Sequence, residues 1–172
     1  MKQNRIIPIN GEINEGSSMM VILQLLYLNS ENSEDPIYLY INSGGGSIVH
    51  GLAIYDVIHH IKAPVYTVCC GMAASMAAFL LSCGQKGHRY ALPHSRILIH
   101  QPLIFGNGYT SIRTQSQIEK TAQGLNKRRT KLESIMAENS GCSLEVMHAA
   151  CERDNWMDVK EALEFGLIDC VL

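Results

Sequence analysis

The sequence has little charge and almost no charge imbalance. Only 17% of its 172 residues are Asp, Glu, Lys or Arg, 47% are apolar, and the formal net charge is −2. This balance excludes a global basic field that would attract nucleic acid or an anionic membrane. The low fraction of charged residues also favours oligomerisation, because exposed apolar surface is usually buried against a partner. The one basic cluster lies among helix formers, and we interpret it as a solvated helix face: Lys127, Arg128, Arg129 and Lys131.

Two further absences concern the compartment. None of the six cysteines is spaced as CxxC, and the adjacent Cys69 and Cys70 fall in an expected strand, where their side chains point to opposite faces. We therefore interpret all six as small buried apolar residues in a reducing compartment. The N-terminus also lacks the charged and then apolar segments of an export signal. These absences predict a cytoplasmic protein without a metal site.

Residues 63–84 carry no charge and are numerous enough to cross a bilayer. Pro64 and Gly71 interrupt this stretch, however. Its first part, VYTVCC, is rich in β-branched residues, whereas its second part, ASMAAFLLS, is rich in helix formers. A buried strand followed by a buried helix explains this change of character better than a membrane span does.

The chain alternates between strand-like and helix-like segments. The expected strands are residues 5–9, 37–41, 65–70, 89–92 and 96–100. The expected helices are residues 17–28, 48–61, 112–138, 143–151 and 159–165, together with one that carries Ser75. Residues 42–47 (NSGGGS) are expected to form a tight loop, and Gly166 to end the last helix in a left-handed conformation. This order predicts a single α/β domain over residues 1–172 with a largely parallel sheet.

The helix expected over residues 112–138 is long for a domain of this size and mostly polar. At 1.5 Å per residue it measures roughly 40 Å, so it should project from the body. A projecting helix of this kind needs a partner, which again indicates a multimer.

The first candidate site is the NSGGGS stretch between a strand and a helix. Its three glycines allow the backbone to approach a ligand closely and to turn its N–H groups inward, as a phosphate or an oxyanion requires. A plain tight turn explains the same residues equally well. The stretch lacks the Lys-Ser/Thr ending of a nucleotide-binding P-loop.

The second candidate is Ser75, a lone hydroxyl inside GMAASMAAFLL. It follows a strand and Gly71, and its small neighbours leave room for a substrate. The start of a helix also supplies N–H groups for a developing negative charge. Helix capping or core filling explains a serine here too, and the sequence is not the GxSxG elbow.

His100 and Asp154 complete the set of candidates. His100 ends an apolar strand, whereas Asp154 lies in the charged turn ERDNW. Taken singly, they are explained as a bystander histidine and a solvent-facing cap. Taken together, a glycine loop, a serine, a histidine and an aspartate, each at the end of an element, are what acyl transfer requires.

Several longer stretches resemble the caseinolytic protease (ClpP) family of serine peptidases, from about Arg5 to the C-terminus. They are IYLYINSGGGS, GLAIYDVI, GMAASMAAFLL, RYALPHSRILIHQP, ERDNWM and EALEFGLID. The resemblance implies that Ser75 is the nucleophile, His100 the general base and Asp154 the third member of a catalytic triad. It also implies that the backbone N–H groups of Gly46 and Met76 hold the oxyanion.

The resemblance further implies a crotonase-like αβ spiral with a protruding handle, here about residues 101–138, and an assembly of two stacked seven-membered rings. Unfolded polypeptides would be cleaved inside the chamber. An AAA+ unfoldase of the ClpX, ClpA or ClpC type would feed them in and use the ATP, so this chain needs no cofactor of its own. The unfoldase would dock on apolar positions: Tyr38, Tyr40, Val68, Cys70, Tyr90 and Leu92.

The chain departs from the family pattern in several places. Gly44 replaces a proline, the 101–116 segment is longer than usual, and the axial segment before the first strand is expected to be missing. These departures keep a second hypothesis open, in which the chain is a ring subunit with little activity until a catalytic paralogue or unfoldase binds. Crotonase-type acyl-CoA chemistry and a capsid-maturation protease are two further alternatives.

Overall fold

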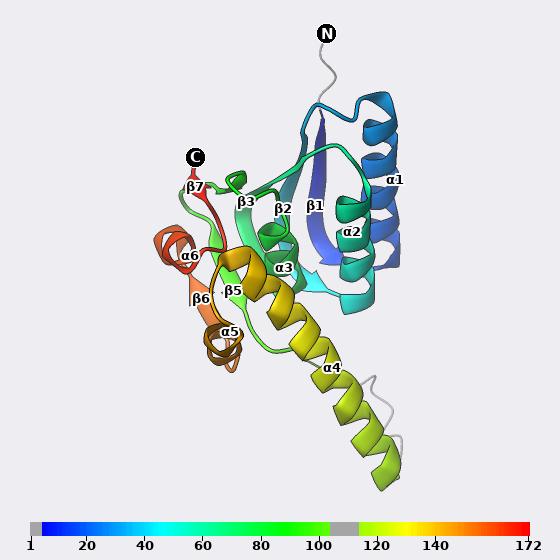
Figure 1. The fold of residues 1–172 in the computed structure, drawn as a ribbon, viewed down its shortest axis with the longest axis vertical. Helices are drawn as coiled ribbons and strands as arrows, with labels where there is room; N and C mark the ends of the chain where they lie inside the picture. Colours follow the sequence, from blue (N-terminus) through cyan, green and yellow to red (C-terminus); the bar gives the residue numbers. More distant parts are fainter. Residues whose placement is uncertain (1–4, 104–113) are drawn as a thin grey trace.

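The computed structural model describes residues 5–103 and 114–172, which form one mixed α/β structure (Figure 1). Its strands are β1 (Ile6–Ile13), β2 (Ile37–Gly46), β3 (Val65–Ala74), β4 (Arg89–Ala91), β5 (Arg96–Ile99), β6 (Asn155–Met157) and β7 (Cys170–Val171). Its helices are α1 (Glu15–Glu31), α2 (Ile48–His60), α3 (Met76–Ser82), α4 (Gln115–Ser140), α5 (Leu144–Ala150) and α6 (Val159–Phe165). The predicted alternation and the largely parallel sheet are confirmed.

The sheet has the order β1-β2-β3-β4-β7, with all of these pairs parallel. The long strand β3 pairs with β4 through Thr67, Val68 and Cys69, and with β5 through the residues from Met72 onward. The short strand β6 runs antiparallel to β5. β3 therefore changes partner along its length, and its second half leads directly to Ser75.

One face of the sheet forms the core, and α1, α2 and α3 lie against it (Figure 1). Along β2 the residues alternate: Ile37, Leu39 and Ile41 are fully buried, whereas Tyr38 and Tyr40 are half-buried on the opposite face. This period of two is what a strand with one core-facing side requires.

Helix α4 projects from the body of the molecule, as the sequence predicts (Figure 1). A capping box at Thr114 begins it, and Gly141, at φ 76°, ends it in the left-handed conformation. Its buried residues, Glu133, Met136 and Ala137, all lie near its C-terminal end. Among the described residues, α4 packs on the body only at this end, which supplies a wall of the candidate site. The part of the handle and of the 101–116 segment that falls on residues 104–113 lies outside the described residues.

Two details of the sequence prediction were wrong at element boundaries. α1 begins after Asn14, whose side chain caps it, and not at the expected Ser17. β2 continues through Gly46, so the stretch 42–47 is not a tight loop. Its glycines instead extend the ladder with β1 after a register shift between Asn10 and Glu12, because backbone groups at the end of β1 offer hydrogen-bond partners that local turn propensity ignores.

The charge-free stretch 63–84 contains β3 and α3, and among the described helices none is long and apolar enough to cross a membrane. All six cysteines are free, but the prediction that all are buried was wrong, since Cys70 and Cys142 are half-buried and Cys170 is exposed. Gly166 ends α6 at φ 86°, as expected.

Candidate active site

Ser75 occupies a strained turn between β3 and α3. Its backbone angles are φ 57° and ψ −122°, and it is the one non-glycine among the described residues with a positive φ. Its N–H donates to the carbonyl of Leu98 at 2.9 Å, and its carbonyl accepts from the N–H of Phe79 at 3.1 Å. These two hydrogen bonds hold the strained conformation in place, which is typical of functional positions.

The hydroxyl of Ser75 does not cap α3, although the residue occupies the N-cap position. The capping interpretation of this serine is therefore wrong. The residue is also only half-buried and lines an open cleft, so it does not fill the core. The hydroxyl thus remains available for chemistry.

The glycine-rich end of β2 lies directly against Ser75. Gly45 has φ 94°, and a Cβ on it would stand 2.6 Å from the carbonyl oxygen of Ala74, 2.8 Å from Cβ of Ser75 and 3.0 Å from the nitrogen of Met76. Only glycine permits this approach. The end of β2 therefore lies against the N-terminus of α3, where the first N–H groups have no acceptor within the helix.

His100 and Asp154 face each other across the β5–β6 pair. The ladder ends with Ile99 opposite Asn155, so the residues just beyond it are neighbours. Nδ1 of His100 lies 3.7 Å from Oδ1 of Asp154, which is longer than a hydrogen bond. The side chain of Asp154 is 70% exposed, and Nδ1 of His100 is buried without a hydrogen-bond partner among the described residues. The two side chains are adjacent, but they do not form a hydrogen bond with each other.

The candidate residues share one open cleft of about 910 Å³. Ser75, His100, Asp154 and the glycines Gly44, Gly45 and Gly46 all line it. The structure therefore brings together the three side chains and the glycine-rich stretch that the sequence singles out. Met76 does not line the cleft but lines a smaller pocket beside it.

This small pocket, about 40 Å³, opens next to Ser75 and His100. Its walls are mainly apolar: Ile48, Met76, Phe79, Pro102, Leu132, Met136 and Cys151. Sequence reasoning missed it because its walls come from several elements far apart in the chain. It also missed Gly51 of α2, where a Cβ would stand 2.3 Å from Cγ of Met76 and would force that side chain to shift.

Two charged residues also line the small pocket. Nε of Arg129 donates to Oε1 of Glu133 at 2.7 Å, and Nη2 donates to Oε2 of Glu152 at 2.7 Å. The hydrogen bond to Glu152, followed by the one to Glu133, raises the pKa of Arg129, while Arg129 lowers the pKa of Glu152. The second oxygen of the buried Glu133 lies 2.8 Å from Nδ1 of His148.

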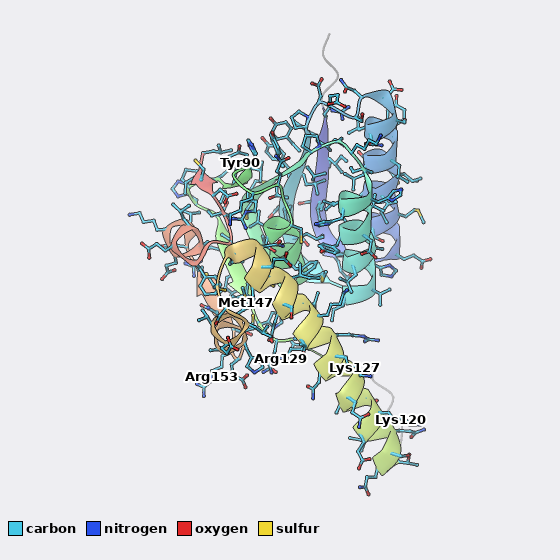
Figure 2. All side chains as sticks on the ribbon, in the orientation of Figure 1. Tyr90, Lys120, Lys127, Arg129, Met147 and Arg153 are labelled. Atoms are coloured by element: carbon cyan, nitrogen blue, oxygen red, sulfur yellow. The ribbon has the colours of Figure 1, made fainter. Side chains whose placement is uncertain are left out.

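The basic cluster of α4 is therefore not a uniformly solvated face. Lys127, Arg128 and Lys131 are exposed, as predicted, but the side chain of Arg129 is only 15% exposed. Arg129 lies on the side of the helix toward α5, with Lys127 farther along the projecting part (Figure 2). Arg128 stays exposed and lines the large cleft.

The predicted docking positions lie on neighbouring strands, with Tyr40 opposite Val68 and Val68 opposite Tyr90. Tyr90 lies at the opposite end of the molecule from the projecting tip of α4 (Figure 2). The six positions differ in exposure: Val68 is 1% exposed, Leu92 is exposed, and Tyr38, Tyr40, Cys70 and Tyr90 are half-buried. Val68 therefore lies buried beneath the exposed residues of this surface and is not itself part of it.

Sequence reasoning missed two members of the same surface. The ring of Tyr66 stacks on that of His88 with centroids 3.9 Å apart. Nδ1 of His88 lies 2.8 Å from the hydroxyl of Tyr90. Tyr66 was detectable, because it keeps the period of two with Val68 and Cys70 along β3.

Comparisons of the sequence with known proteins identify its relatives. A sequence model described as Clp protease matches residues 1–172. A relative from Synechococcus sp. (strain CC9605), named ATP-dependent Clp protease proteolytic subunit 3, is 49% identical over 168 residues, or 98% of this chain and 82% of the relative. Proteins of the same name from Synechococcus sp. (strain CC9902) and Parasynechococcus marenigrum (strain WH8102) are each 48% identical over the same shares.

Proposed function

Because the chain belongs to the Clp protease family, we propose that it is a serine endopeptidase, the proteolytic subunit of an ATP-dependent Clp protease that cleaves unfolded polypeptides. The observation that carries this proposal is the shared cleft. Ser75, which has a strained backbone and a hydroxyl that does not cap α3, lines this cleft together with His100 and Asp154. This arrangement matches the roles of nucleophile, base and orienting acid.

In the proposed reaction, Oγ of Ser75 attacks the carbonyl carbon of a peptide bond. Nδ1 of His100 is the nitrogen that faces Asp154, which leaves Nε2 to take the proton from the serine and then pass it to the departing amine. Water, deprotonated in turn by His100, hydrolyses the acyl-enzyme and restores Ser75. Asp154 fixes the tautomer and stabilises the imidazolium.

The tetrahedral intermediate carries an oxyanion, for which Gly46 and Met76 are the proposed donors. Gly46 follows Gly45 at the end of β2, and the nitrogen of Met76 lies close to Gly45. Two backbone N–H groups fixed before the reaction stabilise the charge without any reorganisation cost.

The small apolar pocket next to Ser75 is the proposed site for the substrate side chain that precedes the scissile bond. Ile48, Phe79 and Met136 are among its walls. It would select a medium-sized apolar residue, because burial of that side chain contributes binding free energy of about 1.5–3 kcal/mol.

We further propose that residues 1–172 form one domain with the crotonase-like αβ spiral and assemble into two stacked seven-membered rings. Helix α1 supports assembly because it is apolar on its outer side as well as on its inner side. Its large exposed apolar residues are Met19, Met20, Leu23, Leu26 and Tyr27. A surface helix of a monomer normally has a polar outer face.

The proposed external partner is an AAA+ unfoldase of the ClpX, ClpA or ClpC type. It would dock on the sheet face that carries Tyr38, Tyr40 and Tyr90, and it would use the ATP, so this chain itself holds no cofactor. The half-buried aromatic rings of this face support the assignment, since such rings anchor protein partners. Six free thiols fit a reducing, cytoplasmic location.

A second candidate is a ring subunit that becomes active only with a paralogue or an unfoldase. The 3.7 Å gap between His100 and Asp154 favours it, as does Nδ1 of His100, which has no hydrogen-bond partner within residues 5–103 and 114–172. Sedimentation of the purified chain, with each fraction assayed on a fluorogenic short peptide, separates the two. Cleavage by a two-ring species supports a self-sufficient protease, whereas small inactive species support dependence on a partner.

Labelling with a fluorophosphonate tests the nucleophile directly. Wild-type chain should be labelled at Ser75, and Ser75→Ala should not be labelled at all. Ser134→Ala, which removes an exposed hydroxyl of α4, should be labelled at the wild-type rate. Labelling that survives in Ser75→Ala would place the nucleophile elsewhere.

A further inference from the structure

Arg129 connects three segments that meet beside the candidate site. Besides its bonds to Glu133 and Glu152, its Nη1 donates to Oε1 of Gln101 at 3.1 Å. Gln101 follows His100 directly at the end of β5, and Glu152 precedes Asp154 by two positions. One guanidinium on α4 thus holds the segment with the proposed base and the turn with the proposed acid.

Arg129, Gln101 and Glu152 form a closed ring of hydrogen bonds, in which one link goes to a backbone carbonyl. Nε2 of Gln101 donates to the backbone carbonyl of Glu152 at 2.9 Å, while both residues also bind Arg129. Beyond the pair formed by Ile99 and Asn155, the hydrogen bonds between these two segments in the described part of the chain are those of this ring. The ring therefore determines how far apart the segments lie past the end of the ladder.

The guanidinium group of Arg129 is well suited to holding Gln101 and Glu152 together. Its side chain is 15% exposed and that of Glu133 is 5% exposed, so solvent screens their interaction only weakly. A guanidinium offers several donors in one fixed plane, whereas a lysine offers a single flexible ammonium group. Glu133 accepts a hydrogen bond from the guanidinium and is itself hydrogen-bonded to His148 on α5, so it fixes the position of the guanidinium.

We propose that Arg129 is a positioning residue for the reaction, one that sets the separation of His100 and Asp154 by holding Gln101 and Glu152 together. This inference rests on the proposed serine-protease function. It explains why one member of a basic run turns inward while Lys127, Arg128 and Lys131 remain exposed.

The test compares Arg129→Met, which keeps an aliphatic stem, with Lys131→Met as the matched control on the same helix. In Arg129→Met we expect the rate of Ser75 labelling by a fluorophosphonate and kcat on a short peptide to fall about 10- to 100-fold, the range for misplacement of a reacting group by about 1 Å. KM should stay within about twofold. Lys131→Met should match wild type in all three measurements.

Two further variants separate positioning from a general loss of stability. Arg129→Lys should recover only part of kcat, because one ammonium group cannot hold Gln101 and Glu152 at once. Glu152→Gln should lower kcat by itself, and its effect should be smaller when Arg129 is already Met, because both changes break the same ring. Full additivity of the two losses would contradict a shared ring. If circular dichroism shows that Arg129→Met is unfolded, Arg129→Lys and Glu152→Gln decide the question.

The outcomes distinguish this inference from the proposed function. If wild type is labelled and Arg129→Met is labelled equally fast, the protease proposal stands and the positioning role is overturned. If wild type is not labelled, the proposal of a self-sufficient protease fails, and hydrogen exchange of residues 96–103 and 151–156 decides the positioning role. Faster exchange of both segments in Arg129→Met, but not in Lys131→Met, supports that role, and unchanged exchange overturns it.

Discussion

Replacement of Gly45 by alanine should abolish most of the activity while leaving the chain folded. The new Cβ would stand 2.6 Å from the carbonyl oxygen of Ala74, 2.8 Å from Cβ of Ser75 and 3.0 Å from the nitrogen of Met76. Real Cβ atoms essentially never lie within 3.0 Å of such atoms, so the end of β2 must move away from Ser75. If one oxyanion donor is lost as a result, kcat should fall about 10²- to 10³-fold.

Gly87 supplies a matched control, because its φ is 87° but a Cβ on it would meet nothing within 4 Å. Gly87→Ala therefore carries a similar left-handed backbone cost, about 1–2 kcal/mol, without any clash at the site. The assay is kcat and KM on a fluorogenic peptide, together with urea unfolding of both variants. Gly87→Ala should lose stability but keep kcat. Wild-type kcat in Gly45→Ala would refute the role of this close approach.

Three other predictions follow from the same structure. Burial raises the pKa of the Asp169 carboxyl, but hydrogen bonds and charge from Arg89 outweigh it and lower that pKa. The carboxylate thus stabilises the fold above about pH 4, and this contribution is lost as the pH falls through the lowered pKa. Urea midpoints of wild type and Asp169→Asn should accordingly differ at pH 6 and converge in acid, and equal midpoints at pH 6 would count against the ion pair. The exposed thiol of Cys170 should react with a disulfide reagent at pH 8 before that of Cys83, whose pKa burial raises to about 12. Mass spectrometry after brief labelling measures the order, and earlier modification of Cys83 would contradict the prediction. Finally, Met136→Ala enlarges the small pocket, so the ratio of kcat/KM for a phenylalanine peptide to that for a leucine peptide should rise several-fold, about 1 kcal/mol of discrimination. An unchanged ratio would place the substrate side chain elsewhere.

The elements that local pattern controls could be predicted from the sequence. β-branched runs located most strands, and Ser143 and Gly166 marked helix ends by their capping chemistry. The short strands β6 and β7 were missed, since runs of three and two residues carry no periodicity of their own. The glycines of β2 were assigned to a turn because propensity does not register the free edge of a neighbouring strand.

Part of the candidate site could also be predicted from the sequence, and part could not. Ser75, His100 and Asp154 could be singled out because each follows or precedes an element where a functional group is expected, and the structure places all three in one cleft. Arg129 could not be separated from Lys127, because helix periodicity alone does not say which side packs against distant segments. The 3.7 Å gap between His100 and Asp154 also depends on tertiary packing and has no signature in the sequence.

The pairing of β5 with β6 has a consequence for the life of the protein before it is complete. β5 ends at Ile99, but its partner begins only at Asn155, near the end of the chain. Because synthesis proceeds from the N-terminus, Ser75 and His100 leave the ribosome before the α4 wall of the pocket and well before Asp154. Under the proposed function, a nascent chain would carry the proposed nucleophile without the proposed acid or the pocket wall, so the order of the sequence would keep the unfinished chain from cleaving its neighbours.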